Sequence, residues 1–237
     1  MMIDTRFRTN QPEIMDDLSM EGEALRDTLD EIAGINRLLG GNRITRKGVE
    51  RLLRKIPKSE EITIVDLGCG NGDMLRMLSD YAARNGWVFK LIGIDANQDA
   101  ICYARELSAL YPNIIYLSEN IFGENFEKLE YDIALCTLTL HHFDDEQVIR
   151  LMQQLKQRAS IGVVVNDLHR NVLAYRLFQL VGFVFRLKAM PKSDGLVSIL
   201  RGFKREELVG FSKKLNTKNY SIHWKWAFRY QWIISKI

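Results

Sequence analysis

The sequence predicts an α/β protein with a Rossmann-like, doubly wound sheet of seven strands. Three observations support this prediction. Short apolar, β-branched runs alternate with stretches of helical spacing, the first run ends in a glycine-rich turn, and two strand-like segments close the chain. Alternating strands and helices favour a parallel sheet with right-handed crossovers. A chain of 237 residues, 46% of them hydrophobic, can bury the core of one such domain.

The first 60 residues precede the sheet and are predicted to be helical. Apolar residues recur at helical spacing from Ile14 to Leu39, Gly40 and Gly41 end this pattern, and a second short helix covers about 45–55. The sheet does not need this segment and leaves its ligand-binding edge open. We therefore expect residues 1–60 to form a helical cap over that edge.

The remaining chain, 61–237, is predicted to form the sheet and its helices. The expected parallel strands are 62–65, 88–95, 113–117, 131–137 and 161–167, separated by helices at 72–84, 98–110 and 144–157. A long helix at 170–187, a loop containing Pro191 and Gly195, and a helix at 204–215 follow. The last two strands, 220–226 and 229–236, are expected to form an antiparallel hairpin at one edge of the sheet.

The composition narrows the classes of partner. A net charge of +3 from 33 basic and 30 acidic residues is too small to indicate a nucleic-acid surface, so a small molecule is the expected partner. Cys69, Cys102 and Cys136 form no CxxC pair, which predicts reduced thiols with neither a disulfide nor a metal site. The absence of a signal-peptide pattern and of an apolar run near the roughly 20 residues of a membrane span predicts a soluble, cytoplasmic protein.

The turn after the first strand carries the strongest ligand-binding signal. It runs from Asp66 to Asp73 and contains Gly68, Gly70 and Gly72, so its backbone can approach a ligand without obstruction by side chains. Asp95 ends the next strand, where its carboxylate can accept hydrogen bonds from both ribose hydroxyls of a nucleoside. The alternative is a tight strand-to-helix turn that binds no ligand. The presence of Asp95 at the end of the next strand disfavours this alternative.

The charges of the turn distinguish between two cofactor classes. A dinucleotide site has the spacing GxGxxG, whereas this turn has GxGxG preceded by Asp66. An anion here would repel a pyrophosphate but could face the ammonium and sulfonium groups of S-adenosylmethionine. The sequence therefore favours S-adenosylmethionine as the cofactor.

From about Ile62 to Asp167 the sequence resembles the class I methyltransferases, and within them the ubiquinone and menaquinone biosynthesis enzymes. The resemblance implies that Asp66 and the three glycines hold the methionine part, that Asp95 binds the ribose, and that Asn120 meets the adenine where the family usually has an acidic residue. Cys136 or Thr137 would touch the methionine end. The full expected cofactor set is Asp66, Gly68, Gly70, Gly72, Asp95, Ala96, Asn120, Ile121, Cys136 and Thr137. Asn120 can equally be only a turn residue.

A second, looser resemblance involves the flanks of this region. The stretches 13–17, 35–37, 194–195 and 201–203 are similar to a bacterial subgroup associated with polyketide or phenolic-lipid gene neighbourhoods. This resemblance implies secondary metabolism and methylation of a phenolic or quinone-like lipid.

Three of the four histidines follow predicted strands at the ligand-binding edge, and we take them as catalytic candidates. His141 and His142 follow the fourth strand, and His169 follows the fifth. A histidine within hydrogen-bond reach would help to remove the proton of a phenol. Asp167 lies beside His169 in sequence and is a candidate to orient it. The alternative is that these histidines are loop or packing residues.

Two apolar segments have a structural and a functional interpretation. The stretch 172–187 is favoured as a helix packed on the sheet; the alternatives are that it lines an acceptor pocket or contacts a membrane surface peripherally. The alternating aromatic residues of the last strands, Trp224, Trp226, Tyr230 and Trp232, are favoured as core.

We therefore predict methyl transfer from S-adenosylmethionine to an oxygen or carbon of a small, apolar or aromatic acceptor. Two alternatives remain. One is a cofactor-binding partner protein without turnover. The other is a nucleic-acid methyltransferase, which the lack of an Asn/Asp-Pro-Pro-aromatic tetrapeptide after the fourth strand disfavours in its adenine-specific form.

Overall fold

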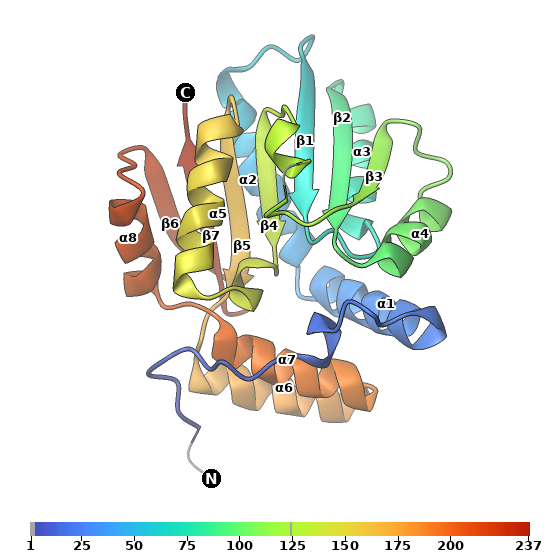
Figure 1. Cartoon of the computed structure of the whole chain (residues 1–237), viewed down its shortest axis with the longest axis vertical. Helices are drawn as coiled ribbons and strands as arrows, with labels where there is room; N and C mark the ends of the chain where they lie inside the picture. The colour runs from blue at the N-terminus through green and yellow to red at the C-terminus, as the bar shows by residue number, and fades with distance from the viewer. Residues whose placement is uncertain (1–2, 124) are drawn as a thin grey trace.

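The computed structural model describes residues 3–123 and 125–237, which form one seven-stranded sheet flanked by helices. The strand order is β3-β2-β1-β4-β5-β7-β6 (Figure 1). The strands are β1 (Glu61–Leu67), β2 (Val88–Asp95), β3 (Ile114–Ser118), β4 (Ile133–Thr137), β5 (Gly162–Leu168), β6 (Tyr220–Lys225) and β7 (Arg229–Ser235). The first five are parallel, and β7 runs antiparallel to both β5 and β6. The predicted Rossmann-like sheet with its antiparallel last pair is confirmed.

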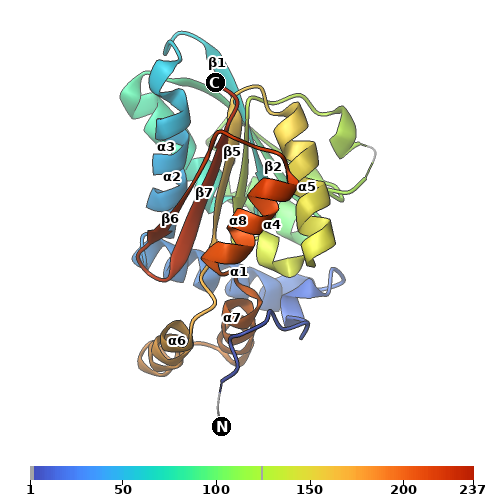
Figure 2. The same cartoon turned by 90° about the vertical axis from the view of Figure 1, so that its left-hand side faces the viewer.

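Helices cover both faces of this sheet. The helices α2 (Gly41–Leu52) and α3 (Asp73–Asn85) lie on one face, and α5 (Asp145–Arg158) and α8 (Arg205–Lys214) lie on the other (Figure 2). One apolar cluster includes Val49 of α2, Leu75 of α3 and Ile101 of α4 (Gln98–Leu107); the other includes Leu151 of α5 and Phe211 of α8. Because both faces are covered, the parallel strands are almost continuously apolar.

Three further helices lie beyond the carboxyl ends of the parallel strands: α1 (Gly22–Leu38), α6 (Val172–Val184) and α7 (Ala189–Arg201) (Figure 1). The N-terminal segment before α1 runs alongside α7 in the same region. The predicted cap segment 1–60 is thus divided in space, since α1 lies at this edge while α2 packs on the sheet face against β5 and β7.

The favoured placement of the apolar helix at 172–187 on the sheet is wrong. Its structured part, α6, packs against α7 and not against the strands (Figure 2). Leu177, Phe178 and Val181 of α6 line a cavity, while Leu180 and Phe183 are 56% and 77% exposed on its outer side. The structure thus agrees with the alternative in which this helix lines a pocket.

The predicted loop around Pro191 and Gly195 is also wrong, because both residues lie within α7. Pro191 is the third residue of the helix, where the missing N–H has no intrahelical acceptor to lose. Gly195 faces the ring of Phe178, and a side chain at this position would overlap that ring. Close packing of α6 on α7 therefore overrides the low helix propensity of glycine.

The helical pattern that begins at Ile14 is interrupted in the structure. Residues Ile14–Asp16 form a single 3-10 turn (η1), and α1 begins only at Gly22. The backbone N–H groups of Ile14 and Met15 donate to the carboxylate of Asp194 in α7, at 2.9 and 3.0 Å. This long-range contact fixes the turn in place of a continuous helix.

The aromatic residues of the last hairpin divide into two classes. Tyr230 and Trp232 of β7 are buried, as predicted, whereas Trp224 and Trp226 are 49% and 68% exposed. The core prediction therefore holds for β7 only. Among the described residues, no helix is both long enough and apolar enough to cross a membrane.

The close approach of α2 to the sheet generates a prediction about stability. A Cβ atom at Gly48 would lie 2.5 Å from a methyl group of Val164 in β5, whereas one at Gly34 in α1 would have nothing within 4 Å. We expect Gly48→Ala to lower the free energy of unfolding by about 1–3 kcal/mol. The matched variant Gly34→Ala should leave it unchanged or raise it by up to about 1 kcal/mol, because alanine favours helix. Urea unfolding measures both, and equal effects would contradict the close contact.

Candidate active site

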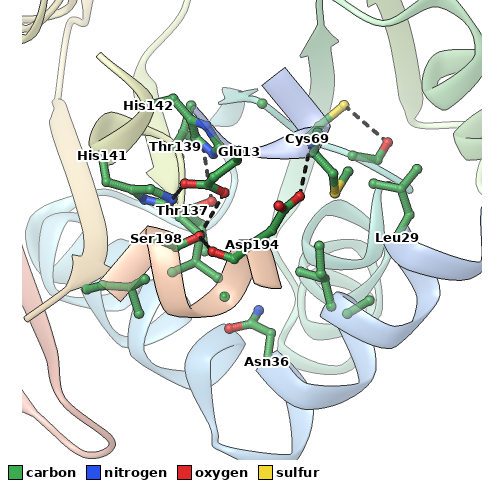
Figure 3. A pocket seen from close by; sticks show the side chains of 18 of the residues that line it. Glu13, Leu29, Asn36, Cys69, Thr137, Thr139, His141, His142, Asp194 and Ser198 are labelled. Carbon is green, nitrogen blue, oxygen red and sulfur yellow. Dashed lines mark hydrogen bonds and ion pairs between the residues drawn. The ribbon is translucent and has the colours of Figure 1, made fainter. Parts of the chain in front are cut away.

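A cavity of about 1070 Å³ lies where the carboxyl ends of the strands meet α1, α6 and α7 (Figure 3). Its volume is at the upper end of the range of small-molecule sites. The predicted site residues that line it are Asp66, Gly68, Gly70, Asp95, Ala96, Asn120, Ile121, Thr137, His141 and His142. The topology thus brings together residues from four strand ends that are far apart in sequence.

The glycine turn has the backbone conformation that its sequence predicts. Gly68, Gly70 and Gly72 all have positive φ, at 66°, 52° and 76°, a region that side chains other than glycine rarely adopt. The N–H groups of Gly68 and Cys69 donate to the carbonyl of Ile94 at 2.8 and 3.0 Å, which holds the turn against β2. The turn therefore presents bare backbone to the cavity.

Asp66, at the end of β1, is a buried carboxylate with an unused acceptor. Its side chain is only 2% exposed, and its Oδ1 atom has no hydrogen-bond partner among the described residues. Burial, with Asp73 and Asp95 nearby, raises the pKa of Asp66 well above its ordinary value. A carboxylate in this state is a favourable partner for a ligand that carries a positive charge.

Asp95 supports the same turn from β2. Its two oxygens accept hydrogen bonds from the backbone N–H groups of Gly70 and Asn97, each at 3.0 Å. Burial raises the pKa of Asp95, and these backbone hydrogen bonds oppose the shift. Each oxygen keeps a second lone pair, so Asp95 can position the turn and still accept from a ligand hydroxyl.

Asn120 lies in the cavity wall, but its side chain also stabilises a turn. The Oδ1 atom accepts from the N–H of Phe122 at 2.9 Å, and the backbone oxygen of Asn120 accepts from Gly123 at 2.8 Å. This is the turn role that the sequence left open. One acceptor lone pair and the amide N–H₂ remain for an adenine.

Three of the predicted site residues do not line the cavity. Cys136 is fully buried in the apolar core between the sheet and α5, so of Cys136 and Thr137 only Thr137 lines the cavity. Gly72 faces the ring of Tyr116, which makes its role that of a packed turn residue. His169 contacts Trp224 and packs beside Tyr230 on the hairpin, away from the other histidines.

His141 forms the main buried ion-pair contact of the site. It is 2% exposed, and its Nδ1 lies 2.7 Å from Oδ1 of Asp167 at the end of β5. Burial opposes ionisation of Asp167, but the charge and the hydrogen bond of His141 more than offset it and hold the pKa of Asp167 below its ordinary value. The prediction that Asp167 is a candidate to orient His169 is wrong, because the loop after β4 turns His141 toward Asp167 and His169 contacts Trp224.

An ionised Asp167 also determines the tautomer of His141. Its oxygens accept from the backbone N–H groups of His141 and Leu168 as well as from the imidazole, so they act only as acceptors. The Nδ1 atom of His141 is then the donor, and Nε2 is left to accept a proton.

Glu13 of the N-terminal segment faces this free nitrogen. One of its oxygens, Oε1, lies 3.5 Å from Nε2 of His141 and has no hydrogen-bond partner; the other accepts from Ser198 at 2.7 Å (Figure 3). Glu13 is 7% exposed, and burial raises its pKa. A carboxyl with a raised pKa beside a histidine is an arrangement suited to proton exchange.

The neighbouring histidine, His142, is held by the same segment. Its Nδ1 lies 2.6 Å from Oδ1 of Asp16, and Arg201 of α7 donates to the other oxygen of Asp16 at 2.6 Å. Although burial opposes ionisation, these two hydrogen bonds keep the pKa of Asp16 below its ordinary value. The N-terminal turn, the β4 loop and α7 are thus joined through charged contacts.

The donor atoms of Glu13, His141 and His142 lie within 4.8 Å of one another and could hold a metal ion, although the sequence predicts none. Glu13, Asp194, Ser198 and Arg201 were missing from the predicted site residues. The available signal was the resemblance of stretches 13–17, 194–195 and 201–203 to one subgroup, which the structure explains by placing them together.

Comparisons with known proteins agree with the site. Residues 64–162 match the family described as "Methyltransferase domain". The mitochondrial ubiquinone biosynthesis O-methyltransferase of Saccharomyces cerevisiae is 31% identical over 106 residues, which are 43% of this chain and 31% of that protein. The matches span no more than 31% of the length of either of two curated relatives.

Two solved structures have the same fold. A plantazolicin methyltransferase in complex with SAH superposes with a TM-score of 0.66 at 16% identity, over 88% of this chain and 89% of that one. An O-methyltransferase family 2 protein from Planctomyces limnophilus, in complex with apigenin, has a TM-score of 0.63 at 18% identity, over 92% and 63% of the two chains. The family match includes the glycine turn, and the solved structures share the fold of this chain.

The raised pKa of Asp66 predicts how cofactor affinity depends on pH. S-adenosylmethionine is cationic at its methionine end, so it binds the ionised form of Asp66 better than the protonated form. Its affinity should therefore rise as the pH increases toward the raised pKa of Asp66 in the free protein and level off above that pKa. Asp66→Asn should bind more weakly and without this rise.

Isothermal titration over a pH series measures this dependence. Asp80→Asn, on the exposed side of α3, is the matched control and should behave like the unchanged protein. Asp95→Ala should lose affinity at every pH, by about 2–4 kcal/mol if two charge-assisted hydrogen bonds are lost. The same rise in the Asp66→Asn variant would exclude Asp66 as the group that senses the cofactor.

Proposed function

We propose that this chain, a class I methyltransferase in its fold and in the sequence of its cofactor site, transfers a methyl group from S-adenosylmethionine to an oxygen or carbon of a small, apolar aromatic acceptor. One observation carries the proposal. His141, which is paired with the buried carboxylate of Asp167, lies in the wall of the same cavity as the glycine turn. A cofactor cradle and a histidine with a free nitrogen therefore share one enclosed space.

The residues of the turn fit this cofactor. The unpartnered oxygen of Asp66 and the bare backbone at Gly68 and Gly70 suit its cationic methionine part, and Asp95 has lone pairs for the ribose hydroxyls. The bound cofactor supplies a methyl group that is already activated on a sulfonium. The protein then has to hold the acceptor in line with that methyl group and to exclude water.

His141 is proposed to accept the proton that the acceptor loses. Asp167 holds Nδ1 of its imidazole at 2.7 Å and stabilises the imidazolium that forms. Nε2 is directed toward Glu13, so an acceptor hydroxyl that bonds to Nε2 must share or displace this contact. Glu13 then lies beside the proton and can take it from the histidine.

The acceptor is proposed to be aromatic and apolar, such as a phenolic or quinone-like lipid. Leu25, Leu29 and Ile32 of α1 and Leu177, Phe178 and Val181 of α6 contribute apolar surface to the cavity. The yeast relative is named for ubiquinone biosynthesis, and the P. limnophilus protein was solved with apigenin, an aromatic ligand. These similarities support the proposal, as does the resemblance of the flanks to one subgroup, which implies secondary metabolism.

The segment before Gly40 is proposed to act as a cap that closes over the acceptor. Leu29 of α1 approaches the position of a Cβ at Gly70 to 3.2 Å, and Glu13 reaches His141. Both contacts place this segment against residues expected to touch ligands. A cap that opens for entry and closes for transfer would exclude water from the sulfonium.

Substitution of His141 tests the proposed proton acceptor. His141→Ala should lower kcat for a phenolic acceptor by about 10²-fold or more while cofactor affinity stays within about threefold. His223→Ala is the control, because His223 is exposed on β6 beside Arg51 and should retain full activity. A chelator should leave the rate unchanged. Full activity of His141→Ala would exclude His141 as the proton acceptor, and loss of activity with chelator would favour a metal at Glu13, His141 and His142.

Hydrogen exchange tests the proposed cap. Residues 14–39 should become more protected when S-adenosylhomocysteine and an acceptor bind together, because the cap closes over both. The exposed helix α8, on the sheet face, provides the internal reference and should not change. Equal protection of 14–39 with and without ligands would show that this segment only stabilises the fold.

A further inference from the structure

Arg229, the first residue of β7, has a role that the proposed reaction does not explain. It lies opposite Leu168 in the antiparallel pairing of β7 with β5, directly after Asp167. Its side chain is 3% exposed and contributes to the cavity wall together with Phe228 and Leu168. A buried arginine is therefore placed one residue along the sheet edge from the carboxylate that holds His141.

The guanidinium of Arg229 has no partner within the part of the chain that the structure describes. Its Nε and Nη1 atoms are buried without a hydrogen bond, and no carboxylate lies within ion-pair distance. The other well-buried arginines differ. Arg170 pairs with Glu207 at 2.5 Å, and Arg201 pairs with Asp16 at 2.6 Å. The lack of a partner is thus specific to the arginine in the cavity wall.

The residues around Arg229 cannot neutralise it. Asn36 of α1 and Arg229 both approach Gly41 of α2, and the Oδ1 atom of Asn36 also lacks a partner. An amide carries no charge, however, so Asn36 cannot neutralise the guanidinium. Asp167 is the acidic group that Arg229 senses, and its oxygens are already used by His141 and Leu168. Burial lowers the pKa of Arg229 to about 10, which still leaves it charged at neutral pH. Among the described residues, the guanidinium of Arg229 is therefore a positive charge in the cavity wall without a counter-ion in direct contact.

The charges of the cavity are unevenly distributed. Arg229 is the single Lys or Arg side chain among the described residues that line it. The acidic residues that line it are Asp66, Asp73 and Asp95 around the glycine turn, and Glu13, Asp16, Glu119 and Asp194 elsewhere in the wall. The acidic end suits the cationic cofactor. The Arg229 end, bordered by Phe228, Leu168 and Trp226, suits an aromatic ligand with a negative charge.

We propose that Arg229 binds the carboxylate of the methyl acceptor, and that the acceptor is an aromatic hydroxy acid. The proposal rests on the proposed function for the identity of the ligand as an acceptor. A planar guanidinium with free N–H groups matches a carboxylate in a two-point contact. The acid anchored there lies at the end of β7, which pairs with the end of β5 that carries Asp167. The hydroxyl on the same ring is the group that we assign to Nε2 of His141.

This assignment also gives the site a means of selection. A neutral phenol would leave the buried charge of Arg229 without a partner, whereas the hydroxy acid satisfies it. Sites built around a buried polar group discriminate strongly against ligands that lack the matching group. Arg229 then determines which aromatic compounds bind, while His141 acts on the hydroxyl.

Binding of two matched probes tests the proposal without methyl transfer. Salicylate and phenol, each with the same pentyl chain, are titrated into the protein loaded with S-adenosylhomocysteine. The salicylate should bind at least about tenfold more tightly than the phenol. Arg229→Met should remove this preference without weakening the phenol, and Arg229→Lys should keep part of it, because an ammonium retains the charge but not the two-point geometry.

The matched control is Lys225→Met, which removes a positive charge from the cross-strand neighbour of Arg229 outside the cavity and should keep the full preference. The melting temperature of Arg229→Met should not fall, because an unpaired buried charge is removed. If Arg229 only stabilised the fold, the melting temperature of Arg229→Met should fall. If Arg229→Met does not fold, the preference of Arg229→Lys for the salicylate over the phenol still tests the proposal.

Equal affinity of the two probes for the unchanged protein would overturn the proposal, as would a full preference in Arg229→Met or Arg229→Lys. This binding test can succeed or fail independently of the test of methyl transfer. A preference for the acid that depends on Arg229 supports the anion site even where no methyl transfer is detected. Transfer to phenols without such a preference would support the reaction and exclude the site.

Discussion

Ionised side chains are buried along the carboxyl edge of the sheet, and their need for partners determines how this edge is covered. An unpaired charge in a protein interior costs several kcal/mol, whereas a paired and hydrogen-bonded one is tolerated. Asp167 of β5 is hydrogen-bonded by His141 of the β4 loop, and Asp16 of the N-terminal segment is held by Arg201 of α7. These contacts join parts of the chain that are 26 and 185 residues apart. If the N-terminal segment or α7 left this edge, charges would remain without partners.

Asp66 and Arg229 depart from this pattern: each has a buried polar atom without a hydrogen bond and no ion-pair partner among the described residues, and both face the cavity. Asp66 has an oxygen without a partner, and Arg229 has two nitrogens without one. Elsewhere at the same edge the protein supplies a counter-charge, so the missing ones are positions where a ligand can supply it. The two groups have opposite signs and belong to different strands, β1 and β7. The sheet order places β4 and β5 between these strands, and His141 and Asp167 come from the ends of β4 and β5. A cationic cofactor at one end and an anionic acceptor at the other would then meet near His141.

The parts of the fold that depend on local sequence were predictable. Each parallel strand has its own β-branched run, and the positive φ angles of the turn require glycine at Gly68 and Gly70, so both features can be recognised without knowing what packs around them. The position of His141 at the ligand-binding edge follows from strand order alone. Its partner does not, because Asp167 and His169 are neighbours in sequence and the direction of each side chain is set by the loop after β4. Similarly, Gly195 lowers helix propensity, and only the ring of Phe178 from another helix explains why α7 contains it.

The cover of the sheet edge was least predictable because its contacts are long-range. The first segment contributes Glu13 and Asp16, and α7 contributes Asp194, Ser198 and Arg201, yet neither segment has a motif that is informative alone. Their resemblance to one subgroup is explained if the two segments act as one unit: Asp194 fixes the backbone at Ile14, which sets the position of Glu13 against His141. The cofactor turn lies outside this unit, on β1 and β2. If His141 receives the proton of the acceptor as proposed, substitutions in these two segments should alter acceptor selection more than cofactor affinity, because they act on the position of Glu13 and not on the turn.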